Sequence, residues 1–330
     1  MDRFMQRRTV LAALAAFGFA SLAQAQQAGP LASGYPDHSI ELVVPYSAGG
    51  GTDALARAFA EVSRKYTRQS IMVNNRPGAS GSIGYTDVIN SKPDGYKLAL
   101  LTVEVTFLNS LGIAKFTHDA FVPIARLNFD PSAITVRADS PWNTIEDFIA
   151  AAKKNKGDIK MGNAGNGSIW NLTASALEDQ AQVKFNQVPY QGAAPAVLAL
   201  MGGHIDAVAV SPAEVGVHLG TGNNKLKMLA VMSDQRLKGF ETIPTLKERG
   251  IDVSLGAWRG MAAPKGTPPD VVDYLRGVAE KTAKDPAFIE SLQKLNLGYS
   301  YADANTFGTQ MVSDTAFYKK LIDKIGMKLQ

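Results

Sequence analysis

Two glycine-rich turns contain the residues in this sequence whose types and spacing suit a chemical task. The first runs from Tyr46 to Asp53 (YSAGGGTD) and the second from Gly162 to Ser168 (GNAGNGS). Each turn follows an apolar, strand-like run and precedes a helix-like pattern. Glycine lets the backbone approach a ligand closely, and the unpaired amides at a helix N-terminus attract anions. The pattern therefore indicates a site that grips an anion between two turns.

The first turn departs from the common nucleotide-binding loops. A P-loop needs a Lys-Ser/Thr pair after its last glycine, but Thr52 and Asp53 stand here. The dinucleotide pattern G-x-G-x-x-A is matched loosely from Gly49 to Ala54, yet the next strand ends in NNR, without an acid for the ribose hydroxyls. A tight turn without a ligand is the alternative for either turn alone. That alternative becomes weaker because both turns occupy the same strand-to-helix position.

The sequence contains no pattern typical of catalysis or metal binding. Its four histidines form no H-E-x-x-H or comparable pair, and no G-x-S-x-G nucleophile motif occurs. Without cysteine there is no disulfide, thiol nucleophile or thiolate metal site. Basic residues are scattered, so the net charge of +4 does not indicate nucleic-acid binding. We therefore expect a protein that is not an enzyme and that has no cofactor, no metal and no nucleic-acid partner. The alternative is a secreted, cofactor-using hydrolase or dehydrogenase.

The order of the elements predicts an α/β fold with parallel βαβ units. Strand-like runs at 39–45, 70–74 and 96–102 alternate with helical patterns at 52–66 and 82–91, and a second series covers 144–232. The strand-like RGMAAP (259–264) has no later domain to join, so it is predicted to return to the first sheet, with only helices after it. The simplest architecture is two lobes joined by crossovers near Arg137 and Trp258, with a ligand cleft between them.

Longer motifs carry a family resemblance. They are VVPYSAGGGTD, VNNRPGASGSIG, KPDGY, MGNAGNGSIWNL, VPYQGAAPAVLALMGGHIDA, AVSPAEV and WRGMAAPKGTP. In this order, from about Tyr35 to the C-terminus, they resemble the exported substrate-binding proteins of tripartite tricarboxylate transporters, the TctC or Bug family. The resemblance implies a periplasmic-binding-protein fold, type II-like, with two Rossmann-like lobes around an interdomain ligand cleft. It also implies a carboxylate ligand and delivery to a membrane permease.

The resemblance places the ligand contacts mainly in the two turns, where backbone amides and small hydroxyls hold a carboxylate. The expected residues are Tyr46, Ser47, Ala48, Gly49, Gly50, Thr52, Asp53, Thr102, Asn163, Ala164, Gly165, Gly167, Ser168, Ile169, Trp170 and Ser211. Thr52 and Ser168 are equally expected as helix N-caps. Asp53 is expected to brace its turn, with Arg57 as its i,i+4 partner.

Three more residues have two interpretations each. Glu104 faces solvent or accepts a hydrogen bond from a ligand hydroxyl. Arg259 clamps a distal carboxylate or forms a salt bridge at the hinge. Asn171 stands where many close relatives have histidine, and an asparagine still offers an amide donor.

The N-terminus has the pattern of a secretory signal peptide. Arg3, Arg7 and Arg8 precede an apolar run at 10–23, and AQA ending at Ala25 is a small-x-small cleavage pattern. We expect cleavage near Ala25, by the general or the twin-arginine export route. The expected organisation is a signal peptide (1–25), a flexible lead-in (26–35), a first lobe (36–137 plus 259–330) and a second lobe (138–258).

These expectations combine into a periplasmic, monomeric receptor that binds a small carboxylate for a tripartite tricarboxylate transporter. A C4 dicarboxylate such as malate or succinate is favoured, and a tricarboxylate or an aromatic carboxylate stays open. A ligand-dependent partner of a sensor kinase is a further possibility, because sensing and transport would use the same closed surface.

Overall fold

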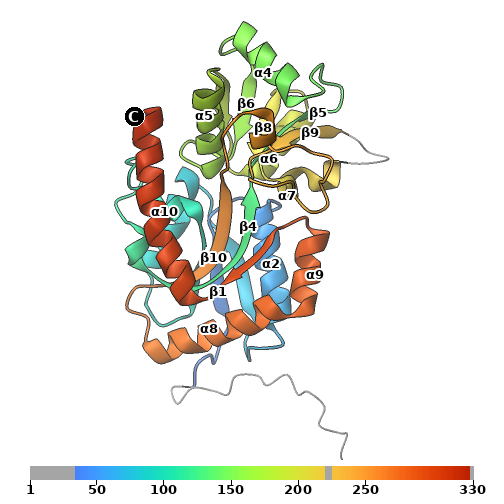
Figure 1. Cartoon of the computed structure of the whole chain (residues 1–330). Helices are drawn as coiled ribbons and strands as arrows, with labels where there is room; N and C mark the ends of the chain where they lie inside the picture. The colour runs from blue at the N-terminus through green and yellow to red at the C-terminus, as the bar shows by residue number, and fades with distance from the viewer. Residues whose placement is uncertain (1–33, 220–224, 328–330) are drawn as a thin grey trace, which may run out of the picture.

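The chain forms two α/β lobes, each built on one sheet (Figure 1). A computed structural model describes residues 34–219 and 225–327. The expected signal peptide, 1–25, and residues 26–33 of the expected lead-in lie outside the described residues. The first sheet has six strands and the second has five. The predicted α/β class, with two lobes, is confirmed.

The first sheet joins three parallel strands to three antiparallel ones. Its strands, in spatial order, are β11 (Tyr299–Ala302), β4 (Phe121–Pro131), β10 (Gly256–Pro264), β3 (Lys97–Thr102), β1 (Ile40–Val44) and β2 (Ile71–Asn75). The helices of this part of the chain are α2 (Gly51–Ser63), α3 (Ser82–Ile89), α8 (Pro269–Lys284), α9 (Pro286–Lys294) and α10 (Ala304–Ile325). Its 3-10 turns are η1 (Ala79–Gly81), η2 (Val103–Thr106) and η3 (His118–Ala120). Strand β10 pairs with β3 and β4, so it returns to the first sheet as predicted.

The second sheet is also mixed. Its strands, in spatial order, are β7 (Asn186–Pro189), β6 (Lys160–Asn163), β8 (Ala207–Val210), β5 (Ala133–Arg137) and β9 (Leu226–Val231). Its helices are α4 (Ile145–Lys154), α5 (Ile169–Ala181), α6 (Ala193–Met201) and α7 (Pro212–Val215), with η4 (Gly216–His218) and η5 (Lys247–Arg249). Strand β6 is parallel to β7 and β8, and its carboxyl end leads into the second glycine turn.

Local sequence explains where the helices at the turns begin. The hydroxyl of Ser168 accepts the Asn171 N–H at 3.1 Å, so Ser168 is the N-cap of α5, one of its two expected roles. Helix α2 begins after Gly50, which has no side chain to cap it. Thr52, the other expected cap, is the second residue of α2. Its hydroxyl is therefore available for a different contact.

The chain crosses between the lobes at Ser132 and Leu255, earlier than predicted. Strand β4 ends at Pro131, which has no N–H for a sheet ladder, and the following β5 pairs with β8 and β9 of the second sheet. The expected boundary at Arg137 is therefore wrong by one strand. The expected return at residue 259 is also late, because β10 begins at Gly256. The Ser132 N–H donates to the Leu255 carbonyl at 2.9 Å, so the two crossovers lie side by side.

Two smaller expectations are also corrected. Only helices were expected after RGMAAP, but β11 (YSYA) pairs with β4 at the edge of the first sheet. Four residues are too few for their alternation to reveal a strand. Tyr35, expected in a flexible lead-in, is buried, and its hydroxyl donates to the Gly95 carbonyl at 2.8 Å.

The last helix connects both lobes along one side of the molecule (Figure 1). Helix α10 packs on β4 and η2 and also reaches α5 of the second lobe. Trp258 Nε1 donates to Asp314 of α10 at 2.7 Å, which fixes the helix to β10. Near its end, Lys324 pairs with Asp179 of α5 at 3.3 Å. None of the helices within 34–219 and 225–327 has the length and apolar character needed to cross a membrane.

Candidate ligand site between the two turns

The two glycine turns face each other across the gap between the lobes. The first follows β1 and opens α2, and the second follows β6 and opens α5. Ser47 Oγ donates to the Gln191 carbonyl of the second lobe at 2.7 Å. Ser80 Oγ donates to the Asn166 carbonyl in the second turn at 2.6 Å. The turns thus share one cleft, and the lobes touch across it.

A small cavity lies between the turns, with a volume of about 20 Å³. Its walls are Tyr46, Ser47, Gly50, Thr52, Ala164, Trp170, Ala193 and Glu214. This space is about what a single water needs. An organic acid is larger, so its entry requires the lobes to move apart.

Six of the eight wall residues belong to the set expected from the sequence. The two that sequence reasoning missed are Ala193 and Glu214. Both lie in motifs that carried the family resemblance, GAAPAV and AVSPAEV. Their spacing gave no local reason to single them out, because they reach the cavity only through the packing of the two lobes.

Asp53 braces the first turn from behind. Its carboxylate accepts hydrogen bonds from the Gly49 N–H, from Arg57 Nε and from Asn75 Nδ2, each at 3.0 Å. Burial raises the pKa of this carboxyl, but these hydrogen bonds outweigh burial, and the pKa is lowered. The expected Arg57 partner is confirmed. Gly49 and Ala48 line a neighbouring, mostly apolar pocket of about 350 Å³ rather than the cavity.

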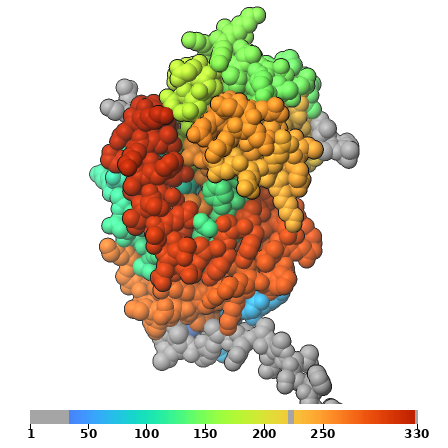
Figure 2. Space-filling view, viewed as in Figure 1, coloured from blue at the N-terminus to red at the C-terminus, as the bar shows by residue number. Residues whose placement is uncertain are grey.

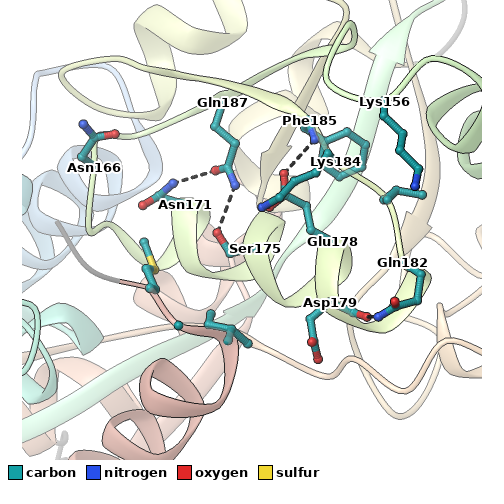
Figure 3. A pocket seen from close by; sticks show the side chains of 14 residues that line it. Lys156, Asn166, Asn171, Ser175, Glu178, Asp179, Gln182, Lys184, Phe185 and Gln187 are labelled. Atoms are coloured by element: carbon teal, nitrogen blue, oxygen red, sulfur yellow. Dashed lines mark hydrogen bonds and ion pairs between the residues drawn. The ribbon is translucent and has the colours of Figure 1, made fainter.

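Two asparagines hold the second turn in place, Asn163 within the turn and Asn171 near the start of α5. Asn163 Oδ1 accepts the Gly165 N–H, and Asn171 Oδ1 accepts the Gly167 N–H, both at 2.9 Å. Gln187 accepts a hydrogen bond from each asparagine amide and lies beside Asn171 in Figure 3. Asn171 borders a separate pocket of about 640 Å³ between α5, β7 and the end of α10. The two asparagines therefore position the turn and do not line the cavity.

Glu104 is buried, so the interpretation that it faces solvent is wrong; 1% of its surface is exposed. One carboxylate oxygen accepts the N–H of Ile169, the first residue of α5, at 2.8 Å. The other accepts the Thr102 hydroxyl, which also pairs with Tyr85 at 2.7 Å. A carboxylate at a helix N-terminus is favourable by about 0.3–1 kcal/mol, and by more when buried. A first-lobe glutamate thus occupies the amide site of the second-lobe turn.

Glu214 makes the converse contact, from the second lobe to the first. One of its carboxylate oxygens accepts the N–H of Gly51, the first residue of α2, at 2.7 Å. The other lies 3.4 Å from Arg259 Nη2. Burial raises the pKa of the Glu214 carboxyl, although Arg259 and the Gly51 N–H act in the opposite direction. Each turn therefore binds a glutamate of the opposite lobe.

Arg259 forms an ion pair at the hinge, which is one of its two expected roles. It lies on β10, where its guanidinium bonds to Asp130 of β4 and donates to the Thr52 hydroxyl at 2.8 Å. The Asp130 and Arg259 side chains are almost fully buried. Arg259 does not line the cavity in this arrangement of the lobes. The guanidinium instead joins the crossover strands to the start of α2.

Two more residues from the expected set, Tyr46 and Ser211, carry hydroxyl groups. The Tyr46 hydroxyl donates to the Ser80 carbonyl at 3.4 Å, and burial raises the pKa of this phenol, so it stays neutral. Ser211 precedes α7, and its buried hydroxyl has no hydrogen-bond partner within 34–219 and 225–327. Within those same ranges, no cluster of His, Asp or Glu could hold a metal ion.

A larger hollow lies on another face of the molecule. Figure 2 shows it between the 233–241 segment of the second lobe and the 293–299 segment of the first, with β4 residues on its floor. Its volume is about 750 Å³, and Phe129, Leu237, Phe240 and Tyr299 contribute its apolar walls. No residue of either glycine turn lines it. The hollow is thus separate from the site between the turns.

The chain is similar to known solute-binding receptors over most of its length. The family model described as "Tripartite tricarboxylate transporter family receptor" (TctC) matches residues 55–327. The "UPF0065 protein in gbd 5'region" of Cupriavidus necator is 33% identical, over 98% of this chain and 97% of that protein. A crystal structure of a TctC solute binding protein from Polaromonas is 56% identical, covers 88% of this chain and 99% of that one, and has a TM-score of 0.65. The periplasmic binding protein BugD is 32% identical, covers 90% and 100%, and has a TM-score of 0.85.

Proposed function

Because the chain belongs to the tripartite tricarboxylate transporter receptor family, we propose that it is an exported periplasmic receptor that hands a small organic acid to a membrane permease. The ligand that we favour is a C4 dicarboxylate such as malate or succinate; tricarboxylates and aromatic carboxylates are the next candidates. Binding without chemical turnover is part of the proposal. The observation that carries it is the pair of glycine turns, one from each lobe, around a shared cavity.

The geometry of the turns supports an anionic ligand. Helices α2 and α5 both begin at the cleft, and the dipole at each N-terminus favours negative charge. In this closed arrangement each N-terminus already binds a carboxylate, that of Glu214 on α2 and that of Glu104 on α5. Ser47 and Thr52 add hydroxyls to the cavity wall, and Trp170 adds an apolar surface. An acid between the turns contacts both lobes at once. Its contacts are therefore complete only when the lobes close, so binding shifts the protein toward the closed arrangement.

Two structures of the same fold guide the choice of test compounds. One is a Rhodopseudomonas palustris protein with adipate, 24% identical with a TM-score of 0.84. The other is MatC from Rhodopseudomonas palustris with bound malate, 22% identical with a TM-score of 0.78. At these identities the likeness concerns the fold alone, so the two ligands serve only to choose test compounds. Diacids of four to six carbons, the range from malate to adipate, are the starting panel for this chain.

A thermal-shift screen of organic acids at pH 7 tests the proposal. At one hundred times its Kd, a ligand adds about 2.7 kcal/mol to the free energy of unfolding, so we expect Tm to rise by about 5 °C or more for at least one acid. The neutral diamide of each acid is the control and should leave Tm unchanged. A panel in which no acid raises Tm would contradict the proposal. Consumption of the bound acid by the purified protein would contradict binding without turnover.

A further inference from the structure

The cavity is bordered by negative charge that the protein itself supplies. Glu214 lies in its wall, and Glu104 holds the second turn next to it. The guanidinium of Arg259 is bonded to two carboxylates, those of Asp130 and Glu214. With all three groups ionised, one cation against two anions gives this buried cluster a formal charge of −1. An incoming dianion therefore meets a fixed negative group at the first turn.

The first turn is shaped around the Glu214 carboxylate. A Cβ added to Gly50 would lie 3.3 Å from Oε2, and one added to Gly51 would lie 3.0 Å from Oε1. The absence of side chains at these two positions thus lets Glu214 approach the start of α2. Its side chain is 4% exposed, so water hardly screens its charge.

Glu214, which lines the cavity, has unused acceptor capacity. An ionised carboxylate offers about four lone-pair sites. The Gly51 N–H and the Arg259 guanidinium engage two of them. A hydroxyl or ammonium group on the ligand would meet a ready acceptor here, whereas a second carboxylate would be repelled.

We propose that Glu214 determines specificity by requiring a hydrogen-bond donor on the ligand next to its carboxylate. The ligand class is then a 2-hydroxy or 2-amino acid rather than the corresponding plain diacid. The donor binds Glu214, and the neighbouring carboxylate lies toward the second turn. This inference rests on the proposed function and narrows it to one class of acid.

Matched acids that differ only at carbon 2 test the inference. Succinate, malate and aspartate form one series, and glutarate, 2-hydroxyglutarate and glutamate form a longer one. Isothermal titration gives Kd for each acid with the full mature protein and with Glu214→Gln, which keeps the size of the side chain but removes its charge. Glu178→Gln is the control: Glu178 is a buried second-lobe carboxylate that accepts the Phe185 N–H at 2.7 Å and pairs with Lys184, away from the cleft.

In at least one series we expect the wild type to bind an acid with a donor at least tenfold more tightly than the plain diacid. Glu214→Gln should tighten binding of the plain diacid and reduce this ratio to about threefold or less, while Glu178→Gln leaves it unchanged. Equal ratios in the wild type and Glu214→Gln would overturn the role of Glu214 and leave the proposed function standing. If the wild type binds no acid, both the role of Glu214 and the proposed function are contradicted. Circular dichroism and Tm of each variant identify a misfolded protein, in which case Glu214→Ala and Glu214→Asp replace it under the same criterion.

Discussion

Gly50 lines the cavity, as expected, and has a neighbour that the sequence did not predict. The sequence indicates that glycine is needed where a ligand approaches the backbone. The structure places the carboxylate of Glu214 closest to this position, 3.3 Å from where a Cβ would be. The backbone of Gly50, with φ of −86° and ψ of 171°, is open to any residue. Glycine is therefore required here because a side chain would crowd Glu214, and not because of the backbone angles.

We expect Gly50→Val to weaken acid binding at least tenfold, or about 1.4 kcal/mol, while the fold is kept. The added side chain pushes against Glu214 and against the second lobe when the cleft closes. Titration calorimetry measures the affinity, and far-ultraviolet circular dichroism checks the fold. Ala48→Val, on an exposed residue of the same turn, serves as the matched control. Wild-type affinity in Gly50→Val would remove the first turn from the site.

Residue-level prediction succeeded where the reason was local. Ser168 was expected as a cap and Asp53 as a brace, because both interactions join residues a few positions apart. It failed for Glu104 and Glu214, which bond to amides 65 and 163 positions away in the other lobe. The spacing of residues in the sequence cannot predict contacts between residues so far apart. They exist only once the two lobes close against each other.

At the scale of elements, Asp285 ties two helices of the first lobe together. It is the N-cap of α9, where it accepts the Ala287 N–H at 2.7 Å. It also accepts the Tyr66 hydroxyl at 2.7 Å and Lys65 Nζ at 2.9 Å, just beyond the end of α2. Burial raises the pKa of this carboxyl, but the three hydrogen bonds outweigh burial and lower it. The charged form is thus the one that stabilises the contact.

Asp285→Asn should therefore lower the free energy of unfolding by about 1–3 kcal/mol at pH 7. A lowered pKa means that the stabilisation is present above the ordinary value of 3.8 and is lost as the pH falls through the lowered value. Denaturant unfolding between pH 3 and 7 should show the gap to the wild type closing in acid. Asp273→Asn, on an exposed residue of α8, should stay within about 0.5 kcal/mol throughout. A gap that stays constant down to pH 3 would contradict a role for the charge.

Elements were predicted well where periodicity was strong and poorly where partners had to be chosen. The alternation of strand-like and helical patterns predicted β1, α2, β2, α3 and β3. Strands β1 and β3 were the clearest because they are buried, largely apolar runs. The segment after Pro131 was expected in the first lobe but joins the second sheet, since nothing in AITVR indicates which sheet it pairs with. Strand β11 was missed because its four residues are too few for an alternating pattern to show.

At the scale of the whole molecule, the cavity of about 20 Å³ requires movement of the lobes for any acid to enter. The adjacent crossovers at Ser132 and Leu255 are the natural axis of this movement, because they are the points where β4 and β10 leave the first sheet.

We expect small-angle X-ray scattering to record a smaller radius of gyration with a bound acid than without it. Closing the cleft brings the two lobes together, and the crossovers act as the hinge. The titration midpoint should match the Kd from calorimetry. A non-binding acid from the screen is the control and should not change the scattering. Unchanged scattering at saturation would contradict a hinge-closing mechanism.

Helix α10 has a practical consequence for following this movement. One end is fixed to the first lobe through Asp314 and Trp258, while Lys324 rests against Asp179 of the second. Any swing of the lobes must slide the final turn of α10 along α5. The sequence has no native thiol, so cysteines introduced at 324 and 179 would accept a pair of fluorophores or spin labels selectively. The distance between these two surface labels would therefore report the closing of the cleft, and no residue at the binding site needs to be altered.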